Sequence, residues 1–436
     1  MKSKPWIFRG ASLRPFNRAS ILVLCMLGSA SVLTPLRTYA QAQVLTQAPF
    51  TLRQAVESAL ARLPETRSAP QRREAVESQS RAARSWTPEP VAFESSLRTD
   101  RALSNNGDRE YVAGVSIPIW LPGQRNGGIA LAQAEQVEVD SRIAAASLRA
   151  AAAVRDAWWA LHLARIDLTV IEERMSNAAQ LAADVTRRVR AGDLARADQH
   201  QADAALAAAE ADAAAARTSE LQASQALRAL VGPAITTPLA TAAEAVPELS
   251  GPAGIEAALR QHPAVQELSA RADTARRSRD LAGLQRRANP EVSLATTRER
   301  GNFEERYGQS ITIGVRIPFG SDDRYRAKVA TAAADQTEAE VQLAIESERI
   351  TSEIELAQAR VSLARSAAEA AEKRAVLSRE AQGFYEKSFR LGETDLPTRL
   401  RIGLDTFAAE RQSARARVEQ AHAISQWRQA LGLLPQ

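Results

Sequence analysis

The sequence predicts a mainly α-helical protein with a membrane β part, made of two copies of a unit in which two strands precede a long helical hairpin. Three observations predict this fold class. Short motifs recur at an offset of 200 residues, and apolar residues follow helical spacing over very long stretches. Segments of about ten residues alternate apolar with small or polar side chains, as transmembrane β-strands do.

The N-terminal segment has the composition of an export signal. Residues 1–40 contain six basic residues and no acidic one, and their apolar stretch, 21–33, precedes the small-residue ending Thr38-Tyr39-Ala40. A basic start, a short apolar stretch and a small-residue cleavage site are typical of a secretory signal peptide. The apolar stretch is too short to span a bilayer well. We therefore expect residues 1–40 to be a signal peptide.

Charge and cysteine content exclude several classes of protein. The net charge is +5, but without residues 1–40 the chain has 50 basic and 51 acidic residues, which argues against nucleic-acid binding. The single cysteine, Cys25, excludes a disulfide framework and a cysteine-ligated metal site. Leu24 stands where a bacterial lipidation site needs a small residue, so lipidation of Cys25 is the less favoured alternative to its removal with the signal peptide.

Internal self-similarity is the strongest signal in the sequence. Residues 114–118 (GVSIP) recur as residues 314–318 (GVRIP), and Gly192 recurs as Gly392. Because the matches follow one another in the same order at nearly the same offset, chance does not explain them. The expected boundaries are 41–232 for the first structural repeat, 233–252 for a connection and 253–436 for the second structural repeat.

Each repeat contains a pair of amphipathic strands. In the second repeat, Ile311, Ile313 and Val315 alternate with Thr312 and Gly314. One apolar and one polar face fit a transmembrane barrel, which meets lipid on one side and water on the other. An amphipathic sheet of a soluble domain is the alternative. The predicted strands lie at about 91–99 and 110–120 in the first repeat and at about 291–298 and 306–319 in the second.

A long helical hairpin follows each strand pair. From Ile350 to Ala375, eight positions at spacings of three and four residues are all apolar, and the same register 200 residues earlier is apolar as well. Sustained repeats of this kind predict a coiled-coil seam, in which alanine lets helices approach closely. The predicted hairpins span about 124–231 and about 324–432, and their turns lie at Gly192 and Gly392.

One chain supplies only four of these strands. Lipid tolerates no open sheet edge, and small membrane barrels need about eight strands. Four strands cannot close a barrel alone. We therefore expect several chains to share one barrel and to bundle their long helices in the same assembly.

An ordered set of motifs runs through the whole chain after residue 40. The motifs are TLRQAVESAL at 51–60 with Pro64, its echo EAAL at 256–259 with Pro263, the strand endings IPI at 117–119 and IPF at 317–319, and the turns RAGD at 190–193 and RLGE at 390–393. In this order, on a duplicated chain, they resemble the TolC family of outer-membrane efflux channels. No single motif is specific; the resemblance depends on the set.

The resemblance implies a homotrimer in the outer membrane of a Gram-negative bacterium. Its 12-stranded barrel, with four strands from each of three chains, would continue into an α-helical barrel in the periplasm. The family also implies a passive export duct that works with a periplasmic adaptor protein and an inner-membrane pump.

The expected cargo follows from the branch of the family that the chain is most similar to. Residues 124–128 (QRNGG), 389–393 (FRLGE) and 429–435 (QALGLLP) are most like the heavy-metal, CzcC-like branch, whereas 320–324 (GSDDR) departs from it. This similarity implies export of heavy-metal cations with an RND-type pump. The alternatives are drug or small-molecule efflux, a type I secretion duct of the same family, or a periplasmic coiled-coil adaptor.

The turns of the two hairpins are the expected site of partner contact. An always-open duct would leak, so its periplasmic end must close and partners must open it. The residues expected to dock the adaptor are Arg190, Ala191, Gly192, Arg390, Leu391 and Gly392. Glycine suits a tight turn that needs positive φ.

Acidic residues beside these turns are the expected periplasmic aperture. They are Asp193, Glu393 and Asp395, which threefold symmetry would repeat as rings of negative charge. Such rings favour cations over anions. The alternative is that these acids only suit the dipoles of the returning helices.

No catalytic, cofactor or metal site is predicted. The four histidines are His162, His200, His262 and His422. None has a second histidine three or four residues away, the spacing that a zinc site on one helix face needs. We therefore expect a protein that is not an enzyme and holds no cofactor.

Overall fold

The computed structural model describes residues 49–102, 104–233, 239–240, 243–248, 251–319 and 322–435. These residues belong to one compact unit, Pro49–Gln436. The expected signal peptide and Cys25 lie outside the described residues. In the described part of the chain, no helix is both long enough and apolar enough to cross a membrane.

Both halves of the chain have the same order of elements. The first half contains α1 (Leu52–Leu60), α2 (Pro64–Arg84), β1 (Ala92–Thr99), β2 (Arg109–Pro118), α3 (Gln124–Ala191) and α4 (Arg196–Val231). The second contains α5 (Gly251–Gln261), α6 (Pro263–Leu284), β3 (Glu291–Arg300), β4 (Gly308–Arg316), α7 (Asp322–Arg390) and α8 (Leu396–Ala430). The helix pair ahead of each strand pair was not among the predicted elements, although Pro64 and Pro263 stand at the first helical positions that proline favours.

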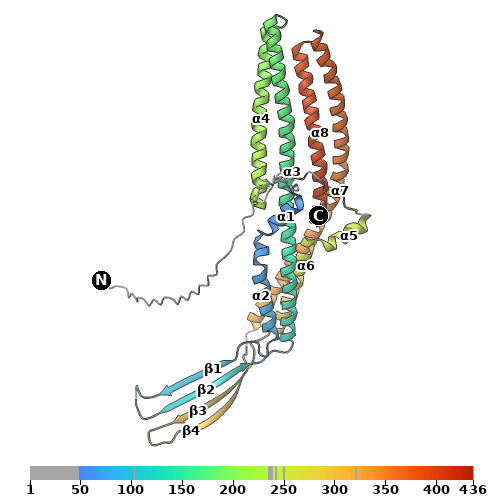
Figure 1. The fold of residues 1–436 in the computed structure, drawn as a ribbon. Helices are drawn as coiled ribbons and strands as arrows, with labels where there is room; N and C mark the ends of the chain where they lie inside the picture. The colour runs from blue at the N-terminus through green and yellow to red at the C-terminus, as the bar shows by residue number, and fades with distance from the viewer. Residues whose placement is uncertain are drawn as a thin grey trace, which may run out of the picture. The chain divides into compact units, whose positions relative to one another are not determined.

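The long helices form two antiparallel hairpins, α3/α4 and α7/α8. Helix α3 packs against α4, α6 and α8, and α7 packs against α8 and α6. Figure 1 shows the hairpins side by side, with the strands at the opposite ends of α3 and α7. The turns at the hairpin ends and the loops of the sheet therefore lie at the two extremes of these helices.

The strands form one antiparallel sheet in the order β1-β2-β3-β4, so β1 and β4 are its open edges. The register pairs Phe93 with Val115, Val115 with Leu294, and Leu294 with Ile313. These side chains therefore share one face, where Phe93 is 73% exposed and Ile313 is 75% exposed. An exposed apolar face of this size is expected of a surface that meets a partner or lipid.

The side chains at the predicted seam positions are buried or half-buried between packed helices. In α7, Ile350, Ile354, Ala357, Ala368, Ala371 and Ala375 are buried, and Val361 and Ala364 are half-buried. The same register in α3, from Ala150 to Met175, is buried or half-buried at every position. The helix faces predicted to pack are therefore the ones that pack.

Replacing Ala368 with leucine is expected to destabilise the protein by about 1–3 kcal/mol, because the added side chain overpacks a site where Ala368 meets Ala371 and Ala416. Ala364, which is half-buried, should respond in the same direction. Glu369→Leu is the matched control, because Glu369 is exposed and only pairs with Arg365. Urea unfolding of the assembled protein measures the difference, and equal midpoints for Ala368→Leu and Glu369→Leu would count against this register.

Glu372, which lies outside the seam register, does not serve as a second control. Its carboxylate accepts hydrogen bonds from Ser413 and Arg417 of α8, which hold its pKa below the usual value. A substitution at Glu372 would therefore break contacts between α7 and α8.

A buried polar cluster ties the connection to both hairpins. Glu244, in the segment between α4 and α5, pairs with Arg155 of α3 at 2.9 Å and with Arg428 of α8 at 3.2 Å. Ser425 donates a hydrogen bond to the same carboxylate, and Arg155 also donates to Gln429. The Arg155 side chain is only 1% exposed. In the sequence Arg155, Glu244 and Arg428 are only separate charges far apart along the chain.

Candidate functional site at the hairpin tips

The two hairpin turns have the same backbone geometry. In the first, the amide of Asp193 donates to the carbonyl of Arg188 at 2.9 Å, and Gly192 donates to Val189 at 3.1 Å. In the second, Glu393 donates to Ser388 at 3.0 Å and Gly392 donates to Phe389 at 3.2 Å. Both pairs are the Schellman pattern that ends a helix at a left-handed residue.

Glycine occupies that left-handed position in both turns. The φ of Gly192 is +87° and that of Gly392 is +78°, as the sequence predicted for tight turns. Apart from its own chain neighbours, no residue has an atom within 4 Å of a Cβ added to either glycine, so the turns are open to solvent and to a partner. Their flanking residues Arg190, Ala191, Arg390 and Leu391 are exposed as well.

The two tips are joined by a small core. Phe389 of α7 is 3% exposed and packs with Val185 of α3 and Leu396 of α8. Guanidinium groups lie over its ring from both hairpins, Arg188 of α3 at 5.3 Å and Arg399 of α8 at 4.8 Å. Each such contact contributes on the order of 1 kcal/mol. The turns that the sequence placed at separate tips are therefore held together.

One arginine of this core, Arg399, has a shifted pKa. Burial lowers the pKa of Arg399, while the carboxylates of Glu386 and Asp184 oppose that shift. The arginine stays charged because its pKa is far above neutral. The tip core therefore keeps a half-buried cation between the two hairpins.

The three predicted aperture acids lie at the turns but differ in their contacts. All three are exposed. Glu393 accepts a hydrogen bond from Ser388 at 3.3 Å. Asp395 is the N-cap residue of α8, yet its side chain makes no capping hydrogen bond. In α4 the acid at the helix start is Asp198, which accepts from the amide of Ala195 at 3.1 Å, and Asp193 lies in the turn before it.

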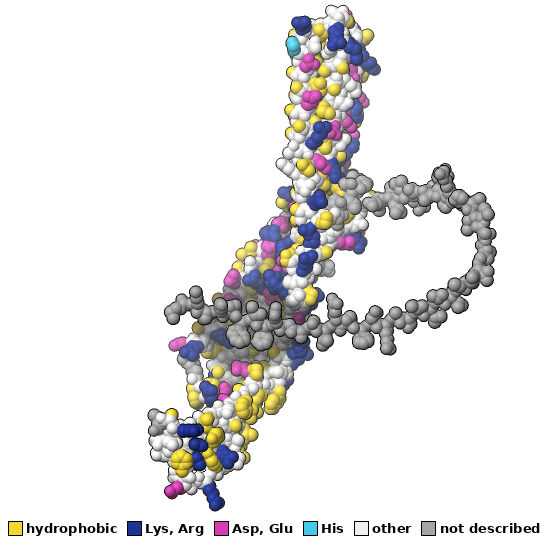
Figure 2. Space-filling model, turned by 60° about the vertical axis from the view of Figure 1, so that its left-hand side comes forward, with side chains coloured by type: hydrophobic (Ala, Val, Ile, Leu, Met, Phe, Trp, Pro, Cys, Tyr) yellow, Lys and Arg dark blue, Asp and Glu magenta, His cyan; other side chains and the backbone are white. Residues whose placement is uncertain are grey.

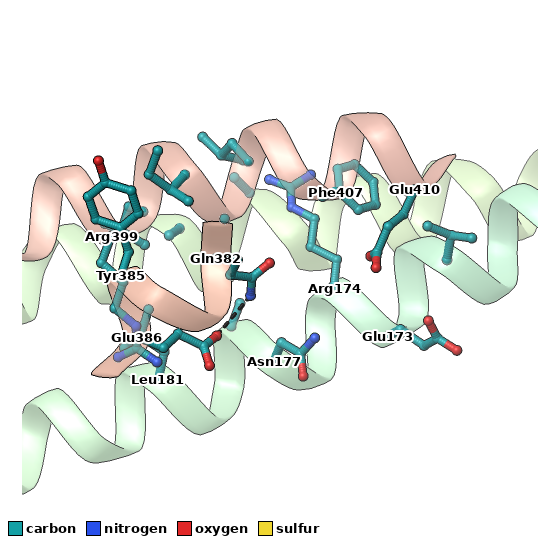
Figure 3. Close-up of a pocket in the computed structure, with 18 residues that line it drawn as sticks. Glu173, Arg174, Asn177, Leu181, Gln382, Tyr385, Glu386, Arg399, Phe407 and Glu410 are labelled. Carbon is teal, nitrogen blue, oxygen red and sulfur yellow. Dashed lines mark hydrogen bonds between the residues drawn. The ribbon is translucent and has the colours of Figure 1, made fainter. Parts of the chain in front are cut away.

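A groove of about 310 Å³ runs between the hairpins just below the tips. Figure 3 shows its lining, which comes from both hairpins, and the guanidinium of Arg174 lies 4.8 Å from the Phe407 ring. Gln382 donates a hydrogen bond to Glu386 at 2.8 Å inside the groove. This groove was not among the predicted features, because the pairing of two distant hairpins has no local sequence signal.

The described residues contain no cluster of three or more histidine, cysteine, aspartate and glutamate side chains suited to a metal ion. His162 packs between the rings of Trp158 and Trp159, and its burial lowers its pKa. His200 is exposed on α4. The histidines therefore lie in separate environments in this part of the chain.

Comparison with known proteins gives a family match to part of the chain and a shared fold for most of it. The sequence model of the family described as "Outer membrane efflux protein" matches residues 55–233. A comparison with curated protein sequences gave no match.

The solved structures that share the fold include three outer-membrane or channel-forming proteins. The structure of CusC, which addresses folding and transmembrane channel formation, is 17% identical, has a TM-score of 0.74, and covers 88% of this chain and 92% of its own. VceC of Vibrio cholerae is 17% identical, with a TM-score of 0.70 and coverage of 87% and 96%. The open MtrE outer membrane channel of Neisseria gonorrhoeae is 18% identical, with a TM-score of 0.70 and coverage of 88% and 89%.

At these identities the solved structures establish the fold, and the family match covers the first half of the chain, residues 55–233. The mainly helical architecture with a few antiparallel strands is that of outer-membrane channels, as the motif set predicted. The similarity to the heavy-metal branch stays a prediction. Residues 55–233 match the outer membrane efflux protein family, and the fold is that of solved outer-membrane channel structures.

Proposed function

We propose that this chain is the passive export duct of a tripartite efflux system, in which three copies share a 12-stranded barrel. The observation that carries this proposal is the four-stranded sheet, which has one exposed apolar face and open edges at β1 and β4. Only strands from other copies would close those edges without exposing backbone groups to lipid. In this assignment residues 1–40 are the signal peptide, and 41–232 and 253–436 are the two repeats.

The long helices offer a second surface for assembly. Leu356, Leu363, Leu377 and Phe384 are exposed on α7 at separations that are multiples of seven residues. Residues at that spacing lie along one face of a helix in a coiled coil. An adjacent copy would cover this face in a periplasmic helical barrel.

Native mass measurement in detergent tests this assembly. We expect the mass of three chains and, in planar bilayers, ion conductance from the same sample. A folded monomer in the membrane fraction would overturn the proposal, because four strands leave two edges open.

The hairpin tips are the proposed docking site for a periplasmic adaptor, which would connect the duct to an inner-membrane pump. Three features support this assignment: the turns at Gly192 and Gly392 are exposed, Leu391 is 75% exposed, and the groove lies beside them. The proposed docking residues are Arg190, Ala191, Gly192, Arg390, Leu391 and Gly392.

The proposed cargo is heavy-metal cations delivered by an RND-type pump, with the acidic rings as the selective element. Replacing Glu393 and Asp395 with their amides is expected to lower the permeability ratio of cations to anions by roughly a factor of two or more, because two of the three rings lose their charge. Single-channel currents in planar bilayers measure the ratio. Glu380→Gln, an exposed site on α7, is the control.

An unchanged ratio in the doubly substituted channel would reject the rings and leave these acids only a role at the helix start. A lower ratio in Glu380→Gln as well would show that selectivity is spread along the hairpin. Drug efflux and type I secretion are the alternative functions of the same duct.

A further inference from the structure

Three arginines lie on the apolar face of the sheet, at the end where its loops are. In the register of β2 with β3, Arg109 pairs with Arg300 and Tyr111 pairs with Arg298. Tyr111 and Val115 share a face because they are separated by even numbers of residues, and Arg109, Arg298 and Arg300 belong to the same face. Figure 2 shows basic side chains beside hydrophobic ones at this end of the sheet.

These arginines have no acidic partner among the described residues. Arg109 and Arg300 stand directly opposite each other, an arrangement of like charges that destabilises a sheet. Arg300 donates only to the carbonyl of Gly107, at 3.1 Å. The opposite face is different, because there Arg98 lies 3.8 Å from the carboxylates of both Asp108 and Glu110.

Aromatic rings hold two of the guanidinium groups together. Arg298 lies 4.8 Å and Arg300 lies 4.9 Å from the ring of Tyr307, and the Tyr111 ring is 6.3 Å from that of Tyr307. Arg300 is also 5.2 Å from the ring of Phe303. The aromatic rings therefore hold these arginine side chains in place, while no acidic side chain among the described residues neutralises their charge.

The position of this cluster indicates which ligands the three arginines can reach. The helices of an outer-membrane channel extend into the periplasm, so the loops at the other end of the strands face the cell exterior. The cluster lies on the central strands β2 and β3, so a second copy that pairs with β1 or β4 leaves it uncovered. On the face that meets lipid, at this end, the groups within reach are the head groups of the outer leaflet.

We propose that Arg109, Arg298 and Arg300 form a binding site for the phosphate groups of lipopolysaccharide, the phosphate-bearing lipid of the outer leaflet. Guanidinium groups bind phosphate through paired, charge-assisted hydrogen bonds. The bound anion offsets the repulsion between Arg109 and Arg300. The inference rests on the proposed barrel, which makes the apolar face the lipid-facing one.

The test measures binding of lipid A that carries its phosphates to the full-length protein in detergent, by native mass spectrometry. The triple variant Arg109→Gln, Arg298→Gln, Arg300→Gln is expected to bind at least about tenfold more weakly than the wild type, since each lost charged hydrogen bond is worth about a factor of ten. Arg316→Gln is the matched control, because Arg316 lies on the opposite face of β4, 3.8 Å from Glu291. Its affinity should stay at the wild-type value.

Two further probes identify the source of the phosphate. Dephosphorylated lipid A should bind the wild type about as weakly as phosphorylated lipid A binds the triple variant, and inorganic phosphate at the lipid concentration should not compete. Competition by inorganic phosphate would overturn the lipid as ligand. A triple variant with wild-type affinity would overturn the site itself.

The same spectra separate this proposal from the proposed assembly, because they report the number of chains. A wild-type trimer that binds no lipid A overturns the site alone, whereas a wild-type monomer overturns the assembly and with it the site. The triple arginine-to-lysine variant is the control for misfolding, because it keeps the three positive charges. It should assemble and retain more lipid A binding than the glutamine variant, and equal loss in both with intact assembly would show that planar, paired hydrogen bonds are essential.

Discussion

Replacement of Glu244 with alanine is expected to destabilise the folded protein by about 3–5 kcal/mol, the cost of removing one partner from a buried ion pair. The substitution would leave two buried cations, Arg155 and Arg428, without the carboxylate that lies between them. Ser425 would lose its acceptor at the same time. The measurement is the midpoint of urea unfolding, followed by the signal of the tryptophans near this cluster.

Glu248→Ala provides the matched control for this prediction. Glu248 lies in the same connecting segment, four residues from Glu244, but is exposed. Its substitution is expected to change the stability by less than about 0.5 kcal/mol. Equal midpoints for the two variants would mean that the cluster does not hold the connection against the hairpins.

Replacement of Ile313 with arginine is expected to prevent or strongly reduce assembly in the outer membrane. Ile313 lies within β4 on the apolar face, opposite Leu294. A charge on the lipid-facing side of a barrel near the middle of the bilayer costs about 2–4 kcal/mol, and threefold assembly would repeat that cost in every copy. The amount of assembled protein in the outer-membrane fraction measures the effect.

Thr312→Arg introduces the same side chain one residue earlier, on the opposite face of the same strand. Thr312 pairs with Ala295 on the face of small and polar side chains, so the added arginine would enter water. We expect Thr312→Arg to assemble nearly as well as the wild type. If both arginine variants assembled equally, the apolar face would not be the one that meets lipid.

Local patterns account for most of what the sequence predicts correctly. The alternation in residues 311–315 is a property of one strand, and the spacing from Ile350 to Ala375 is a property of one helix. The turns at Gly192 and Gly392 follow from one residue type that adopts positive φ readily. Each of these signals depends on neighbours only a few residues away, so it can be read without knowing the tertiary structure.

Local sequence patterns did not predict the helices α1, α2, α5 and α6. Pro64 and Pro263, which begin α2 and α6, are visible in the sequence, yet all four helices are much shorter than α3 and α7, and their packed faces are decided by contact with those long helices. Without a long periodic stretch, periodicity alone does not separate such helices from connecting segments.

The sequence by itself determined the duplicated order of strand pair and long hairpin, the two faces of each strand and the seam of each long helix. Only the tertiary structure decided that Glu244 meets Arg155 and Arg428, and that Phe389 joins the two tips. It likewise decided that Arg109 stands opposite Arg300. The physical reason is that these contacts join residues far apart along the chain. Their geometry is set by strand register and by the packing of one hairpin against the other, and neither leaves a periodic trace in the sequence.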